Sequence, residues 1–146
     1  MDTTLTSAAI ATIISALTSA AISLYIASKN NKKYLDDQLD AILKIAVQYP
    51  YLENRSFTKT WSSKIDQNDE KYLRYDAYCT LLFNYLERLC KYYDFNLEKV
   101  NSHISIKEWV RLHKEYWNDP LEIFENIDTY DKKFRSLIEE FLNGRN

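Results

Sequence analysis

The sequence predicts an all-α protein in which an N-terminal transmembrane helix continues into a helical stalk and is followed by a small cytosolic helical bundle. Residues 3–28 contain no Asp, Glu, Lys or Arg, whereas the 118 residues after them contain 39 of the chain's 40 such side chains. The chain also has only one glycine and two prolines, too few turn-forming residues to punctuate a β-rich fold. We therefore expect a span over residues 3–28, a stalk over 29–49 and a bundle over 50–146.

The uncharged segment is long enough to cross a bilayer. At ~1.5 Å of rise per residue, a helix of this length reaches about 39 Å, against a hydrocarbon core of about 30 Å. Asp2 precedes the segment, and the first lysines follow it, which is the opposite of the charge order in a secretory signal peptide. We therefore expect the span to be retained. Lys29, Lys32 and Lys33 predict a cytoplasmic C-terminal side and an external N-terminus by the positive-inside rule.

The predicted span has two unlike sides. At 100° per residue, large apolar side chains gather on one side, which carries Ile10, Ile13, Ile14, Leu17, Ala21, Leu24 and Tyr25. The opposite side is small and hydroxyl-bearing and carries Ala8, Thr12, Ser15, Ser19 and Ser23. Lipid surrounds a solitary helix evenly, so three interpretations of the second side remain open: helix-to-helix association, the lining of a pore formed by several copies, or hydroxyls bonded to their own backbone.

The stalk and the first part of the bundle follow from apolar spacing. Steps of four and three between Leu35, Leu39, Ile42, Ala46 and Tyr49 predict that the helix continues beyond the membrane, and Pro50 should stop it. Phe57, Trp61 and Ile65 step by four and predict a short helix. Asn68 or Asp69 then caps the strongest soluble helix. Its core stripe comprises Tyr75, Cys79, Leu82, Leu86, Leu89 and Tyr93.

Three further helices are expected towards the C-terminus. Ser105 and Glu108 have the spacing of a capping box and predict a helix that runs through Trp117. The Asp119–Pro120 pair predicts a short helix through Phe124. The last helix should run from about Tyr130 to Leu142, with Gly144 as its C-cap.

The cysteines agree with a cytosolic location. Cys79 and Cys90 lie eleven residues apart on one predicted helix, about 16 Å along its axis and too far apart for a disulfide. We expect both to be reduced, buried, small apolar residues. The sequon that begins at Asn54 is then accidental, because glycosylation requires a domain outside the cytosol.

The sequence contains no recognisable catalytic or metal-binding constellation. His103 and His113 are ten residues apart, with no partner at a known ligand spacing. With Gly144 as the single glycine, neither a phosphate-cradling loop nor a nucleophile elbow can be built. We therefore expect no enzymatic activity, no metal and no cofactor.

One basic stripe is a candidate for phosphate binding. Lys107, Arg111 and Lys114 lie at i, i+4 and i+7 of the predicted 105–117 helix. An exposed Trp117 or Tyr116 could add base stacking. The segment after the span has 19 basic against 20 acidic groups, which does not support non-specific polyanion binding. A solvated cationic face is therefore the alternative interpretation, although several stripes around one oligomer axis could act together.

The chain resembles uncharacterised bacterial membrane-anchored proteins, including small membrane effectors of anti-phage defence systems. The segments that carry this resemblance are residues 75–87, YDAYCTLLFNYLE, and residues 103–117, HISIKEWVRLHKEYW. Neither segment is a catalytic motif, so the resemblance supplies no site residues. It implies an oligomeric inner-membrane protein that depolarises or breaches the membrane when a nucleotide signal, nucleic acid or partner protein releases it.

These observations lead to one expected function and one alternative. The first is a non-enzymatic effector that homo-oligomerises in the bilayer through Thr12, Ser15, Ser19 and Ser23 and conducts ions or permeabilises the membrane. A nucleotide, an oligonucleotide or a regulatory protein would gate it through the cytosolic bundle. The alternative is a membrane-anchored scaffold or sensor whose bundle binds a partner protein.

Overall fold

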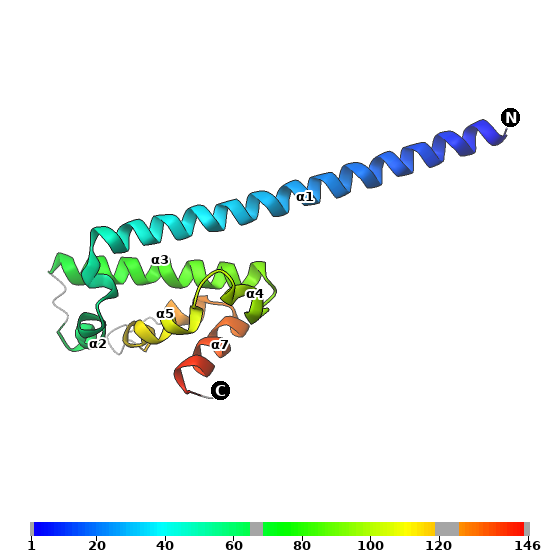
Figure 1. The fold of residues 1–146 in the computed structure, drawn as a ribbon. Helices are drawn as coiled ribbons and strands as arrows, with labels where there is room; N and C mark the ends of the chain where they lie inside the picture. The colour runs from blue at the N-terminus through cyan, green and yellow to red at the C-terminus, as the bar shows by residue number, and fades with distance from the viewer. Residues whose placement is uncertain (1, 65–68, 119–125, 145–146) are drawn as a thin grey trace. The chain divides into compact units, whose positions relative to one another are not determined.

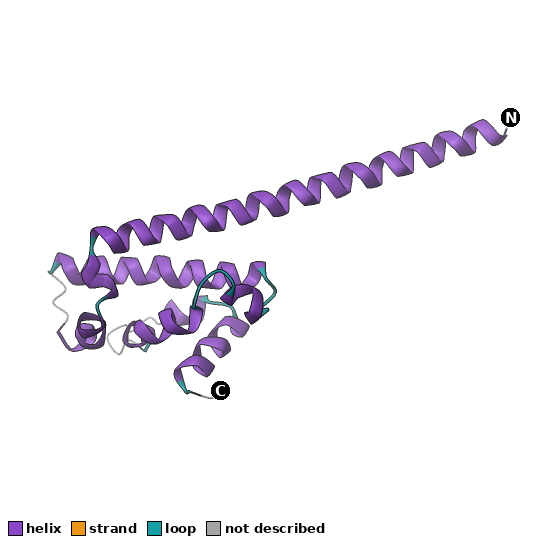
Figure 2. Cartoon of the chain, in the orientation of Figure 1, coloured by secondary structure: helices purple, strands orange, loops and turns teal. Residues whose placement is uncertain are grey.

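The all-α prediction is confirmed by a computed structural model (Figure 1). The structure describes residues 2–64, 69–118 and 126–144. Within these ranges every regular element is a helix, as the colouring of Figure 2 shows. The long helix α1 (Asp2–Gln48) is followed by the 3₁₀ helix η1 (Pro50–Glu53), and the remaining elements are α2 (Arg55–Lys64), α3 (Glu70–Tyr92), α4 (Leu97–Asn101), α5 (Ile106–Leu112), α6 (Lys114–Trp117), η2 (Asn126–Thr129) and α7 (Lys132–Leu142).

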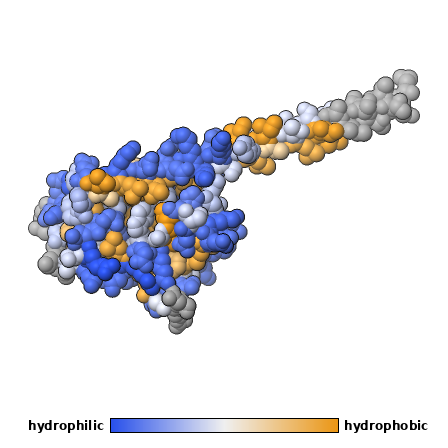
Figure 3. All heavy atoms as spheres, viewed as in Figure 1, coloured by the Kyte–Doolittle hydropathy of each residue, from blue (hydrophilic) through white to orange (hydrophobic). Residues whose placement is uncertain are grey.

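The chain divides into two compact units, residues 1–37 and 38–146. The first unit consists of α1 up to Asp37, and the boundary falls inside the segment predicted as the stalk. The segment Thr12–Gln48 is the one described helix that is long and apolar enough to cross a membrane, with a mean hydropathy of 1.3 and none of the apolar window buried. Its hydrophobic atoms form the exposed orange surface along the helix in Figure 3.

The second unit begins with the last turns of α1. Ile42 is buried, Ile45 and Ala46 are half-buried, and the helix ends at Gln48 immediately before the Tyr49–Pro50 pair. Pro50 occupies the first turn of η1, where its missing N–H is not needed. The predicted continuation of the helix and its termination by proline are both confirmed.

Helix α3 is the centre of this unit. The side chain of Asp69 accepts a hydrogen bond from the Lys71 amide at 2.8 Å, which confirms the predicted N-cap. Cys79 and Cys90 are both buried and unpaired, as expected. The predicted core stripe is confirmed by the buried residues Tyr75, Cys79, Leu82, Leu86 and Leu89, whereas Tyr93 caps the helix and is half-buried.

Aromatic rings from several helices pack around α3. Tyr75 contacts Trp61 of α2 with ring centroids 5.2 Å apart. Further along the helix, Phe83 stacks on Tyr116 at 5.8 Å and contacts Trp117 at 5.0 Å. Pairs of this kind add about 0.5–1.5 kcal/mol to the free energy gained by burying the rings. These aromatic contacts therefore join α2 and α6 to α3.

The predicted helix over residues 105–117 is wrong in one respect, because it is interrupted at His113. The backbone of His113 turns to φ −103° and ψ 23°, which ends α5 and starts α6. The imidazole is completely buried, and the break places it inside the core instead of on a helix surface. The capping box is also wrong, because the Ser105 side chain makes no capping hydrogen bond.

The last helix agrees with its prediction. Asp131 caps α7 by accepting a hydrogen bond from the Lys133 amide at 2.8 Å. The Asp131 amide in turn donates to Glu87 of α3 at 2.6 Å, which ties the start of α7 to the central helix. Gly144 follows α7 with φ +68°, the left-handed conformation expected just after a helix. The helix predicted from Asp119 lies outside the described residues.

Candidate functional site

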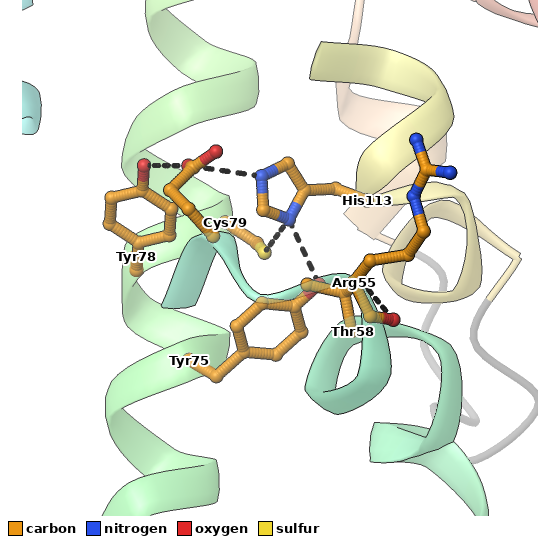
Figure 4. A network of polar contacts seen from close by, with 7 residues as sticks. Arg55, Thr58, Tyr75, Tyr78, Cys79 and His113 are labelled. Carbon is orange, nitrogen blue, oxygen red and sulfur yellow. Dashed lines mark hydrogen bonds and ion pairs between the residues drawn. The ribbon is translucent and has the colours of Figure 1, made fainter. Parts of the chain in front are cut away.

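His113 is the hub of a buried hydrogen-bond network between η1, α3 and the α5–α6 break. Its Nδ1 lies 2.9 Å from the Tyr75 hydroxyl and 3.7 Å from the Cys79 sulfur. Its Nε2 lies 3.3 Å from Oε1 of Glu53, and the same oxygen accepts a short hydrogen bond from the hydroxyl of Tyr78. Figure 4 shows Tyr75 and Cys79 meeting the imidazole from the α3 side.

The donors and acceptors of this network are mutually consistent. Burial raises the pKa of the Tyr75 hydroxyl far above its ordinary value, so this hydroxyl keeps its proton and can donate to Nδ1 of His113 in the tautomer whose ring proton is on Nε2. Nε2 then carries the ring proton and donates to Glu53. Burial acts to raise the pKa of the Glu53 carboxyl, but the hydrogen bonds from His113 and Tyr78 outweigh it and hold the pKa below 4.5. Glu53 is therefore an acceptor-only carboxylate at neutral pH.

Two further groups of the network keep their protons. Burial raises the pKa of Cys79 well above its ordinary value, so its sulfur remains a protonated thiol. The hydroxyl of Tyr78 is held as a donor for the same reason, since burial raises its pKa as well. The Cys79 sulfur and the Tyr78 hydroxyl therefore take part in the network as protonated groups.

A groove of about 290 Å³ lies beside the network, where α2 packs against α5 and α6. One wall of the groove is α2 and the other is the α5–α6 segment. Glu53 lies next to the first wall in the chain, and His113 lies within the second. Glu53 ends η1 just before Arg55 starts α2, and His113 lies between Arg111 and Lys114. The described residues that line the groove are Arg55, Thr58, Lys59, Glu108, Arg111, Leu112, Lys114 and Glu115.

The groove has an excess of positive charge. Among the described residues that line it, four are cations and two are carboxylates. Glu108 lies 3.6 Å from Arg111, and Glu115 lies 3.4 Å from Lys114, so both carboxylates belong to the α5–α6 wall. On the opposite wall, Arg55 and Lys59 are exposed and form no ion pair with any residue that the structure describes. The α2 wall therefore supplies most of the uncompensated charge.

The structure brings together two of the three predicted phosphate-binding residues. Arg111 and Lys114 line the groove, whereas Lys107 does not. Arg55 and Lys59 were not predicted as part of the site, although their spacing of four residues places them on one face of α2. Their proximity to Arg111 is a tertiary contact, for which a single sequence gives no direct signal.

The stacking surface proposed from the sequence is not present. Trp117 is buried against Phe83 and Tyr130. Tyr116 is half-buried, and its hydroxyl lies 2.8 Å from that of Thr80. Both aromatic side chains are therefore used in the core.

The hydroxyl-bearing side of the apolar helix is exposed from Thr12 through Ser23, including Ser15 and Ser19. The Ser23 hydroxyl donates to the carbonyl of Ser19 at 2.9 Å, and on an adjacent side the Thr18 hydroxyl donates to the carbonyl of Ile14 at 2.8 Å. Local hydrogen bonds thus satisfy some of the hydroxyls.

Two isoleucines continue the stripe that starts at Ser15 and Ser19. Ile22 and Ile26 follow Ser19 by three and seven residues, so they lie on the same face of the helix and are exposed. The hydroxyls of this face therefore extend from Thr12 to Ser23, and Ile22 and Ile26 add apolar side chains on either side of Ser23.

Metal binding has no support in the described residues, where no group of three or more His, Cys, Asp or Glu side chains is placed to hold an ion. No family model, curated protein or solved structure matches the chain. The exposed apolar helix and the basic groove are the two features of the described residues that bear on function.

Proposed function

We propose that this protein is a non-enzymatic membrane effector that homo-oligomerises through its N-terminal span and conducts ions or permeabilises the bilayer. The observation that carries the proposal is that none of the apolar window of α1 is buried. Side chains such as Leu17 and Leu24 are 65% and 72% exposed. Burying apolar area of this kind contributes about 25 cal/mol per Å², so lipid or other copies of the helix should cover it.

The two sides of the helix support assembly in preference to a lone anchor. Lipid favours the side that carries Ile13 and Leu17, whereas close helix packing favours small residues such as Ser15 and Ser19. If several copies place the second side around an axis, Thr12, Ser15, Ser19 and Ser23 would form hydroxyl rings. Ile22 and Ile26 would form an apolar constriction, which is a known means of closing a pore by dewetting.

The proposed location is a bacterial inner membrane, with the N-terminus outside and the helical domain in the cytoplasm. Lys29, Lys32 and Lys33 support this orientation. The domain would then be the regulated part, because a cytosolic ligand or partner protein could reach it. Anti-phage defence is the context in which a gated membrane effector of this kind would act.

Recording the current across a bilayer that contains the protein is the decisive measurement. Purified full-length protein is reconstituted into planar bilayers, and current is recorded with and without a candidate ligand. The proposal expects discrete conductance steps under activating conditions, and it expects protease added outside intact spheroplasts to leave the helical domain uncut. A silent bilayer that contains correctly assembled protein under activating conditions would reject conduction, and digestion of the domain would reject the orientation.

A scaffold or sensor is the second candidate function. Its support is the hydrogen bonding of the Ser23 and Thr18 hydroxyls to the helix's own backbone, because such hydroxyls require neither a partner helix nor water. In that case the span would only localise the helical domain, which would bind a protein. Absence of current together with a monomeric mass in detergent would favour this candidate.

A further inference from the structure

We infer that the groove between α2 and the α5–α6 segment is a binding site for the phosphoryl group of a small ligand. This inference deepens the proposed function, since it names the class of ligand that the regulated domain would recognise. It adds Arg55 and Lys59 to the site and assigns them the larger role.

The charges of the groove favour a compact anion. Arg111 and Lys114 are partly compensated by Glu108 and Glu115, whereas Arg55 and Lys59 have no carboxylate partner among the described residues. An anion bound between the walls would gain charge-assisted hydrogen bonds mainly from α2. Arg55 offers a planar guanidinium that can hold two phosphoryl oxygens at once.

The lining of the groove favours recognition of phosphate over recognition of a base. None of the described residues that line it is aromatic, and Leu112 is the single large apolar side chain among them. A nucleobase would therefore find no surface on which to stack. The volume of about 290 Å³ lies at the lower limit of small-molecule sites. These properties suit a small phosphorylated molecule held by its phosphoryl end.

The buried network gives the site a fixed geometry. The contact between Glu53 and His113 joins the segment that precedes Arg55 to the segment that carries Arg111 and Lys114. Thr58 is completely buried below the groove, and its hydroxyl donates to the Arg55 carbonyl at 3.3 Å. The two cationic walls are thus held in place before a ligand arrives, which lowers the entropic cost of binding.

Calorimetric titration of the full-length protein in a non-ionic detergent tests the inference. The probes are pyrophosphate and ATP, and the variants are Arg55→Gln and Lys59→Gln. Lys99→Gln is the matched control, because Lys99 is an exposed lysine of α4 outside the groove and its loss changes the net charge equally. Each groove variant should weaken binding about tenfold, which is the effect of losing one charge-assisted hydrogen bond, whereas the control should bind within about twofold of wild type.

Vesicles that contain phosphatidic acid, compared with vesicles of phosphatidylcholine alone, separate a lipid headgroup from a free ligand. Binding of pyrophosphate or ATP that depends on Arg55 and Lys59 supports the inference with a soluble ligand. If only the binding of phosphatidic acid vesicles depends on Arg55 and Lys59, the inference is supported with a lipid headgroup as the ligand. Absence of binding to every probe, or equal weakening by Lys99→Gln, overturns it. Because none of these measurements requires conduction, the inference can fail while the proposed channel function stands.

Discussion

The Nε2 atom of His113 lies 3.3 Å from Oε1 of Glu53, although the two residues are 60 positions apart in the chain. This contact joins η1 to the break between α5 and α6, and it is made inside the protein, where the His113 side chain is completely buried. A hydrogen bond to a carboxylate is worth about 1.5–3 kcal/mol. It therefore contributes both to the stability of the helical domain and to the spacing of the two groove walls.

Replacing the imidazole with an apolar ring should destabilise the domain. His113→Phe leaves the buried Tyr75 hydroxyl with only the weak Cys79 sulfur as its partner, at a cost of about 1–3 kcal/mol in the free energy of unfolding. All three tryptophans of the chain lie in the second unit, so their fluorescence reports its unfolding by urea. In the Tyr75→Phe background the same change should cost clearly less, because both polar partners are gone. Equal costs in the two backgrounds would mean that the hydrogen bond contributes nothing.

The stability of the domain should fall at acidic pH, partly through Glu53. Its pKa in the folded protein lies below 4.5, so the unfolded chain takes up a proton at a higher pH than the folded one. Glu53 thus stabilises the fold above about pH 4.5, and this stabilisation is lost as the pH falls through the folded-state pKa. Urea midpoints of wild type and Glu53→Gln should differ most near neutral pH and converge in acid. A difference that does not change with pH would show that the charge of Glu53 is not involved.

The two cysteines should be unreactive until the domain unfolds. Both are buried, and burial raises the pKa of Cys90 to about 12 and that of Cys79 well above its usual range. A thiol-specific reagent at about pH 8 should label neither in the native protein, and labelling in urea should follow the fluorescence transition. Leu81→Cys is the positive control, because Leu81 is an exposed residue of the same helix and should be labelled at once. Fast labelling of native wild-type protein would contradict the packing around α3.

The parts of the fold that the sequence predicted are those set by local rules. Residues close in sequence are enough to predict Asp69 as an N-cap and the end of α1 before Pro50. The apolar spacing within α3 likewise predicts that Cys79 and Leu86 are buried. The break at His113 is different, because it depends on Glu53 and Tyr75, which are distant in sequence. Local propensity favoured an unbroken helix there, and burial of the imidazole prevailed.

The basic groove could be predicted only in part for the same reason. Arg111 and Lys114 stood out as one stripe of a predicted helix. Arg55 and Lys59 become their neighbours only because α2 packs against α6, a contact made by the aromatic core. Spacing within one helix cannot report such a pairing, so half of the groove's cations were missed.

Assembly should depend on the hydroxyl side of the span. Ser15→Leu with Ser19→Leu should reduce the oligomeric mass measured in detergent, because bulky side chains prevent close approach of the helix backbones. Ile13→Leu with Leu17→Ile, on the opposite side, is the matched control and should leave the mass unchanged. Equal loss on both sides would mean that the two-sided composition does not direct assembly.

The last prediction distinguishes a water-filled lumen from a dry helix interface. Ser19→Lys places a charge on the hydroxyl side, and in a dry interface this costs roughly 2.5–3.5 kcal/mol on insertion scales and should prevent assembly. In a lumen the lysine is hydrated, so the oligomer should persist and single-channel recordings should show reduced cation conductance. Ile22→Ser provides the complementary test, because removing an apolar constriction should increase the current without a ligand. Loss of the oligomer in Ser19→Lys, together with no change of current in Ile22→Ser, would leave helix packing as the role of this face.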